Sequence, residues 1–196
     1  MLKKVWRLFG KPASNEPPVL VNSIEAQAEA PPRNDSGFVM PFEIRPLAPT
    51  DAPALRQVFR DAIGTLASKH YEPVALQAWQ ASADDPDFAS RLDQGLTLVA
   101  TLQGEHIGFA QLFPQNHIEM LYLSPQGSGL GIATLLCQHL EDEARIAGSR
   151  ELTTASSLAA QRFFESMGFQ VIGEETVRRQ GVALTRLQMR KVLISG

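Results

Sequence analysis

The sequence of 196 residues has one cysteine, Cys137, and lacks any apolar run long enough to cross a membrane as a helix. A single cysteine excludes an internal disulfide and a cysteine-rich zinc site. The four histidines are scattered without the spacing of metal ligands, so no metal is expected. These absences favour a protein of the reducing cytoplasm.

An excess of positive charge is also lacking, because 18 Lys and Arg stand against 21 Asp and Glu, giving a net charge of −3. A nucleic-acid-binding protein needs concentrated Lys and Arg to neutralise phosphates, so no nucleic-acid partner is expected. The acidic balance would instead attract a cationic ligand. With 44% hydrophobic and 20% charged residues, the composition is that of a globular domain.

Aromatic residues are absent between Lys11 and Gly37, where prolines lie among Ala, Glu, Ser and Asn. Such a segment buries too little apolar surface to offset its ordering entropy, so residues 11–40 are predicted to be a disordered linker. Residues 1–10 instead place apolar residues at helical spacing opposite basic ones, which predicts a short amphipathic tail. Weak membrane-surface contact and a frayed terminus both remain open for this tail. Residues 41–196 are the predicted folded domain.

Strand and helix signals alternate within residues 41–196. A strand over 42–47 precedes a helix capped by Thr50 and two shorter helical segments, one opened by Pro73. Strands over 96–102, 106–113 and 118–123 are joined by short turns, which predicts an antiparallel meander. The remaining elements are a helix from 132 to Gly148, a strand over 151–155, a helix over 157–167 and a strand pair around Gln180-Gly181. The alternation predicts a mixed α/β (α+β) fold.

A glycine-rich turn, with glycines at 127, 129 and 131, joins the 118–123 strand to the helix that follows. Glycines immediately before a helix let backbone N–H groups converge on an anion at the positive end of the helix dipole. The spacing lacks the third glycine of the dinucleotide fingerprint, and no Lys-Ser/Thr pair follows as in a P-loop. The turn is interpreted as a phosphate cradle, with a flexible loop as the alternative.

Two blocks of the sequence resemble the GNAT superfamily of acyl-coenzyme-A-dependent N-acetyltransferases. In the first, Leu123-Ser124-Pro125 and the loop Ser128-Gly129-Leu130-Gly131-Ile132-Ala133 resemble the family's strand-end proline and Gln/Arg-x-x-Gly-x-Gly/Ala motif. Ser128 replaces the usual Gln or Arg, and Leu130 replaces a frequent basic residue. The second block, Ala160 to Phe169, resembles the family element Ala-x-x-Phe-Tyr/Phe-Glu-x-x-Gly-Phe. The resemblance extends over about residues 41–193.

This resemblance implies a GNAT-type mixed, mostly antiparallel central sheet, flanked by helices and splayed to admit acetyl-CoA as co-substrate. It implies coenzyme contacts from the strand at Leu121, Tyr122 and Leu123, and from the loop and helix start at Ser128, Gly129, Leu130, Gly131, Ile132 and Ala133. Phe164 lies where many members have the tyrosine that protonates the departing thiolate, so that proton has to come from elsewhere.

The activity implied is acetyl transfer to a primary amine of a small molecule or peptide, by direct attack in a ternary complex and without a metal. The substitutions at Ser128, Leu130 and Phe164 leave a second function open, a non-catalytic sensor or scaffold that binds acyl-CoA. The oligomeric state is not predicted.

Three side chains are candidates for proton transfer. A group of this kind is needed because an aliphatic amine is mostly protonated at neutral pH and must lose a proton before it attacks. Glu119 and His117 share one strand face if pairing is regular, with Ile118, Met120 and Tyr122 on the other. Glu119 is the first candidate base and His117 the second. A solvated or ion-paired carboxylate is the alternative for Glu119. Tyr71, after the first helix, is a candidate acid or a helix-end contact.

Overall fold

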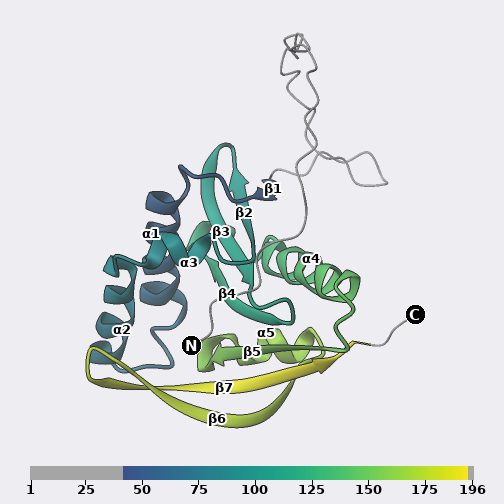
Figure 1. The fold of residues 1–196 in the computed structure, drawn as a ribbon. Helices are drawn as coiled ribbons and strands as arrows, with labels where there is room; N and C mark the ends of the chain where they lie inside the picture. Colours follow the sequence, from purple (N-terminus) through teal and green to yellow (C-terminus); the bar gives the residue numbers. More distant parts are fainter. Residues whose placement is uncertain (1–41, 194–196) are drawn as a thin grey trace, which may run out of the picture. The chain divides into compact units, whose positions relative to one another are not determined.

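The computed structural model describes residues 42–193 (Figure 1). The tail predicted for 1–10 and the linker predicted for 11–40 lie outside the described residues, as do 41 and 194–196. Within the described part of the chain, no helix is long and apolar enough to span a membrane.

Residues 42–193 contain one seven-stranded sheet, in the order β1-β2-β3-β4-β5-β7-β6. Its strands are β1 Phe42–Pro46, β2 Leu96–Leu102, β3 Glu105–Leu112, β4 His117–Leu123, β5 Glu151–Ser157, β6 Gln170–Arg179 and β7 Val182–Val192. Every neighbouring pair is antiparallel except β4 and β5, which run parallel. The mixed, mostly antiparallel sheet is confirmed, including the β2-β3-β4 meander.

The helices begin where the sequence provides a start signal. They are α1 Ala52–Asp61, continued by a π-helical turn over Ala62–Leu66, α2 Pro73–Gln80, α3 Phe88–Leu92, α4 Ile132–Ile146 and α5 Gln161–Ser166. A proline lies in the first turn of both α1 and α2, where its missing N–H has no helical partner to lose. Asp51, rather than the predicted Thr50, is the N-cap residue of α1.

Each face of the sheet is covered by its own helices and buries its own core. On one face, α4 and α5 pack Leu136 and Phe164 against strand residues such as Ile107. On the other, α1 and α3 pack Phe59 and Phe88 against strand residues that include Phe109 and Met120. Figure 1 shows α1, α2 and α3 to the left of the central strands and α4 to their right.

Asp51 joins three elements through a dense set of hydrogen bonds. Its carboxylate accepts two from the Arg45 guanidinium, at 2.7 and 2.9 Å, and one from the Ala48 N–H at 2.7 Å. His106 Nε2, on β3, lies 2.8 Å from Oδ1. The hydrogen bonds from Arg45 hold the pKa of this buried carboxyl well below its usual range. Asp51 thereby fastens β1 and the start of α1 to β3.

Strand β4 contains a bulge at Glu119. The register with β3 pairs Gln111 with Met120 and Leu112 with Ile118, so Glu119 has no opposite residue. The predicted regular alternation is wrong for this reason: Ile118 packs in the α4 core, whereas Met120 packs in the α1 core. A bulge bends its strand and turns side chains to new directions.

The sheet is interrupted between its two parallel strands. β4 and β5 pair only at His117 with Thr153 and at Ile118 with Thr154. Beyond these pairs, the stretch of β4 from Glu119 to Leu123 has β3 as its neighbour on one side and an opening on the other. The candidate site lies at this opening.

Candidate active site

A groove with a volume of about 600 Å³ lies at the opening between β4 and β5. Its lining includes Leu121, Tyr122 and Leu123 of β4, Ser128, Gly129 and Gly131 of the loop, Ile132 and Ala133 of α4, and Phe164 of α5. The structure thus brings together all the predicted coenzyme residues except Leu130, which is exposed and does not line the groove.

The loop before α4 has a backbone that favours glycine at two of its positions. Gly129 and Gly131 have φ angles of +78° and +76°, and a Cβ atom on either would meet no atom of residues 42–193 within 4 Å. Gly131 is the N-cap of α4, whose first turn carries no acidic side chain to occupy its N–H groups. Gly127 serves packing instead, because a Cβ there would lie 2.8 Å from the Ile107 carbonyl oxygen. The space outside Gly129 and Gly131 is therefore open to a ligand.

Phe164 contributes an apolar wall to the groove. Its ring is 3% exposed and packs edge-to-face on Phe163 and Phe169, with centroids 5.2 Å away in both cases. The side chain has no proton to donate.

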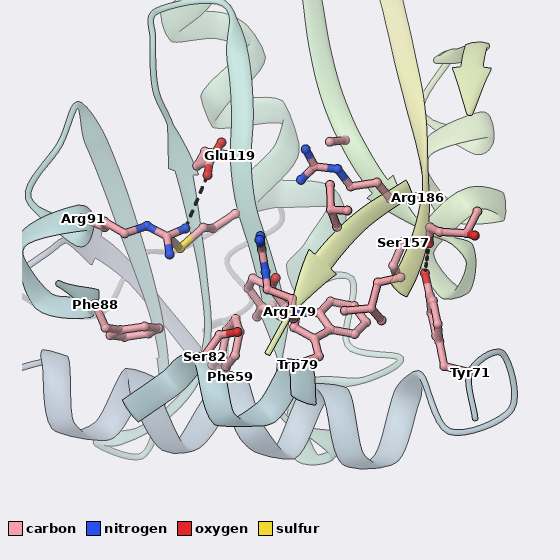
Figure 2. A pocket seen from close by; sticks show the side chains of 16 residues that line it. Phe59, Tyr71, Trp79, Ser82, Phe88, Arg91, Glu119, Ser157, Arg179 and Arg186 are labelled. Atoms are coloured by element: carbon pink, nitrogen blue, oxygen red, sulfur yellow. Dashed lines mark hydrogen bonds and ion pairs between the residues drawn. The ribbon is translucent and has the colours of Figure 1, made fainter. Parts of the chain in front are cut away.

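A second, smaller pocket of about 90 Å³ lies next to the groove, since both are lined by Trp79, Glu119 and Tyr122 (Figure 2). Its walls are strongly aromatic, with Phe59, Tyr71 and Phe88 completing the set. Burial raises the pKa of Tyr122 to about 12, so its phenol keeps its proton at neutral pH.

Glu119 lies where the two cavities meet. This residue lines both, and its side chain is 39% exposed. Arg91 Nη2 lies 3.5 Å from one carboxylate oxygen, and His117 Nε2 lies 3.6 Å from the other. Arg91 is close enough to stabilise the charge, and the partly exposed side chain leaves room for another group.

His117 is next to the Glu119 carboxylate and lines neither cavity. Its Nδ1 is 2.8 Å from Thr153 Oγ1, and that hydroxyl donates to the Asn116 carbonyl at 3.2 Å. The hydroxyl therefore accepts from Nδ1–H, which leaves Nε2 as the acceptor in a neutral ring. Burial lowers the pKa of His117, with Glu119 opposing this shift and Arg186 adding to it.

Tyr71 joins the connection before α2 to two strands. Its hydroxyl donates to the Thr185 carbonyl of β7 at 2.7 Å and accepts from the Leu158 N–H, just after β5, at 2.9 Å. Burial raises the pKa of Tyr71. Its proton is thus already directed at a carbonyl oxygen.

Sequence reasoning missed three arginines that line the small pocket. Arg91 comes from α3, Arg179 from the end of β6 and Arg186 from β7 (Figure 2). No local pattern in the sequence singles them out, because their convergence depends on how the β6-β7 hairpin pairs with β5 and packs against α2. Among residues 42–193, no group of three His, Cys, Asp or Glu side chains could hold a metal ion.

Known proteins with similar sequences and structures share this architecture. Residues 67–192 match the family model described as acetyltransferase (GNAT) domain. The uncharacterized N-acetyltransferase YafP of Escherichia coli is 31% identical over 149 residues, which cover 76% of this chain and 95% of that protein.

Among solved structures, a GCN5-related N-acetyltransferase from Rhodopseudomonas palustris is 38% identical, with a TM-score of 0.75, over 77% of this chain and 95% of that one. The PaiA N-acetyltransferase of Thermoplasma acidophilum, solved in complex with coenzyme A, shares the fold at 19% identity, with a TM-score of 0.63, over 78% and 99% of the two chains. On the family match and the sequence identities, the chain belongs to the GNAT family and is an acetyl-CoA-dependent acyltransferase.

Proposed function

We propose that this enzyme transfers the acetyl group of acetyl-CoA to the primary amine of a small molecule, by direct attack within a ternary complex. The observation that carries the proposal is the meeting of two cavities at Glu119, one a long groove beside a glycine loop and the other a small aromatic pocket. Two substrates bound in the two cavities would meet at this carboxylate.

The groove suits the coenzyme in its backbone chemistry. N–H groups at Gly129, Gly131 and the first turn of α4 would bind the pyrophosphate at the positive end of the helix. This contact does not depend on the basic side chains that Ser128 and Leu130 replace. The unpaired edge of β4 at Leu121–Leu123 would pair with the amide groups of the pantetheine arm, and a β4 N–H would stabilise the tetrahedral oxyanion.

In the proposed reaction, Glu119 accepts a proton from the ammonium, directly or through a water molecule. The neutral nitrogen attacks the thioester carbonyl, the C–N bond forms, and the C–S bond breaks as the oxyanion collapses. The nitrogen gives its second proton to a water molecule, and the thiolate leaves as such or takes a proton from water, since Phe164 cannot supply one. His117, through its Nε2, is the alternative base.

We assign Tyr71 a positioning role in preference to that of general acid. Its hydroxyl already links Thr185 and Leu158, so donating its proton to a thiolate would break the link to Thr185. The ring then holds one wall of the acceptor pocket against Trp79, at a centroid distance of 5.5 Å.

The test is thiol release from acetyl-CoA in the presence of a panel of small amines and short peptides, with mass detection of the product. The expected result is amine-dependent thiol release and a product heavier by one acetyl group. If acetyl-CoA binds but no amine is acetylated, the proposal is wrong and the non-catalytic acyl-CoA binder replaces it.

A further inference from the structure

The small pocket carries a charge opposite to that of the whole chain. Three of its lining side chains are arginines, Arg91, Arg179 and Arg186, and Glu119 is the one carboxylate among them. Figure 2 shows Arg91 approaching from the left, Arg186 from the right and Arg179 between them. The net charge of −3 favours a cationic ligand, but the pocket itself would repel one.

The three guanidinium groups differ in how far they are neutralised. Within residues 42–193, the one ion pair of Arg91 is the distant contact of 3.5 Å to Glu119, whereas Arg186 donates to the Glu175 carboxylate at 2.8 Å. Among the described residues, no ion pair involves Arg179. Arg179 is therefore the side chain best able to receive an anion.

We propose that the acceptor is a small amine that also carries an anionic group, a carboxylate or a phosphate, which Arg179 binds with help from Arg186 while the amine faces Glu119. This inference rests on the proposed function and specifies its acceptor. A guanidinium presents paired N–H donors that match a carboxylate or phosphate. The volume of about 90 Å³ and the aromatic walls fit a compact molecule better than a peptide chain.

The same arginines would select against acceptors that carry only an ammonium group. The anionic group of the proposed acceptor would offset the repulsion for the molecule as a whole. An amine without an anionic group would meet the like charge of the arginines with nothing to offset it.

The β6-β7 hairpin provides a matched control. Val177 and Arg179 line the pocket, and the intervening Arg178 is exposed on the opposite face of β6, where it donates to the Gly181 carbonyl at 2.8 Å. Arg178→Gln and Arg179→Gln thus remove the same charge from adjacent residues of one strand, and only the second removes it from the pocket.

The experiment measures kcat/KM by thiol release for matched acceptors: amino acids, their amides, and aminoalkyl phosphates of similar length. We expect the acids or phosphates to exceed the amides by at least about tenfold. In Arg179→Gln, the anionic acceptors should lose at least about tenfold, mainly through KM, while the amides change less than about threefold. Arg178→Gln should leave both within about threefold. Comparing kcat/KM for the amino acids with kcat/KM for the aminoalkyl phosphates shows which anionic group the pocket prefers.

If amides react as well as the acids, or if Arg179→Gln lowers both equally with an unchanged melting temperature, this inference is wrong although the acetyltransferase activity stands. If no amine reacts, the proposed function fails, and binding then tests the pocket separately. Trp79 lines the pocket and the second tryptophan is Trp6, so the full chain with Trp6→Phe reports on Trp79 fluorescence. Saturable quenching by carboxylates or phosphates that is lost in Arg179→Gln supports the anion site, and no such quenching overturns it.

Discussion

Glu119 owes its place between the two cavities to one extra residue in β4. In a regular strand its neighbours Ile118 and Met120 would share a face, but the bulge sends them to opposite cores. The carboxylate is left at the edge of the opening, with Arg91 and His117 on either side. Such a position suits a group that must meet a substrate and hold a charge.

Glu119→Gln keeps the size of the side chain and removes its charge, so acetyl-CoA should still bind but the amine loses its proton acceptor. We expect kcat/KM to fall by about 10²–10⁴-fold, the usual contribution of a positioned base. The limb of the pH profile that reports Glu119 should vanish, while the limb of the free amine persists. Kinetics and calorimetry on the folded variant measure both.

A loss of less than about threefold would assign the base elsewhere, since it falls below the range for such a group. His117→Asn is then the variant to compare. Because His117 lines neither cavity, the loss in His117→Asn should be smaller than that in Glu119→Gln if Glu119 is the base, and larger only if His117 is the base.

Tyr71→Phe separates positioning from acid catalysis. The change leaves the Leu158 N–H and the Thr185 carbonyl without their partner, which should lower the free energy of unfolding by about 1–3 kcal/mol. Thermal or urea unfolding measures this loss. The rate should fall modestly without altering the shape of the pH profile, whereas loss of the alkaline limb with stability intact would indicate a proton donor.

At the scale of elements, α4 has a left-handed glycine at each end, and only one of them faces the groove. Gly131 at its start and Gly148 beyond its end have φ angles of +76° and +79°, and a Cβ on either would meet no atom of the described part of the chain within 4 Å. An alanine at either position should therefore cost stability about equally, by about 1–2 kcal/mol.

The two alanine variants should differ in coenzyme binding. Gly131→Ala puts a methyl group where the pyrophosphate is proposed to approach, so the Kd for acetyl-CoA should rise by at least about tenfold, or about 1.4 kcal/mol. Gly148→Ala should leave Kd unchanged. Calorimetric titration of both variants decides the matter, and equal affinities would mean that the loop does not hold the coenzyme.

Asp51 connects β1, α1 and β3, and its effect on stability should depend on pH. A carboxyl whose pKa is lowered in the folded state adds stability above its unfolded pKa of about 3.9, and that stability is lost as the pH falls toward the folded pKa. Asp51→Asn should cost about 2–4 kcal/mol at neutral pH, because Arg45 loses its partner. The difference in the free energy of unfolding between wild type and variant, measured by urea unfolding, should narrow below about pH 4. A difference that stays constant there would show that the charge of Asp51 is not what stabilises the junction.

For the whole molecule, residues 42–193 contain both cores and both cavities. The composition of residues 1–40 predicts few buried contacts, so removing them should leave the melting temperature and the turnover of a soluble amine nearly unchanged. Scanning calorimetry and the thiol-release assay on the truncated protein check this. A marked fall in melting temperature would show that the segment packs on the domain.

The sequence by itself determined the order of the elements, the meander and the glycine loop. These features depend on residues close together in the chain: hydrophobic periods, a proline at the start of a helix, and glycines at turns. The residues at which helices and strands begin and end were less well determined by the sequence. The predicted helix over 157–167, for instance, starts later as α5, because β5 extends to Ser157, whose hydroxyl accepts from the Ala160 N–H at 3.3 Å.

The tertiary structure alone decided how the pocket is built. Tyr71 meets Thr185 across 114 residues, and the three arginines converge from α3, β6 and β7. The bulge at Glu119 is equally non-local, because it is defined by register with β3. Contacts of this kind form only once whole elements pack, since side-chain periodicity fixes a face but neither the partner strand nor its register. The sequence therefore determined that a coenzyme could bind. Packing decided the charge of the neighbouring pocket, in which the acceptor of the acetyl group would bind.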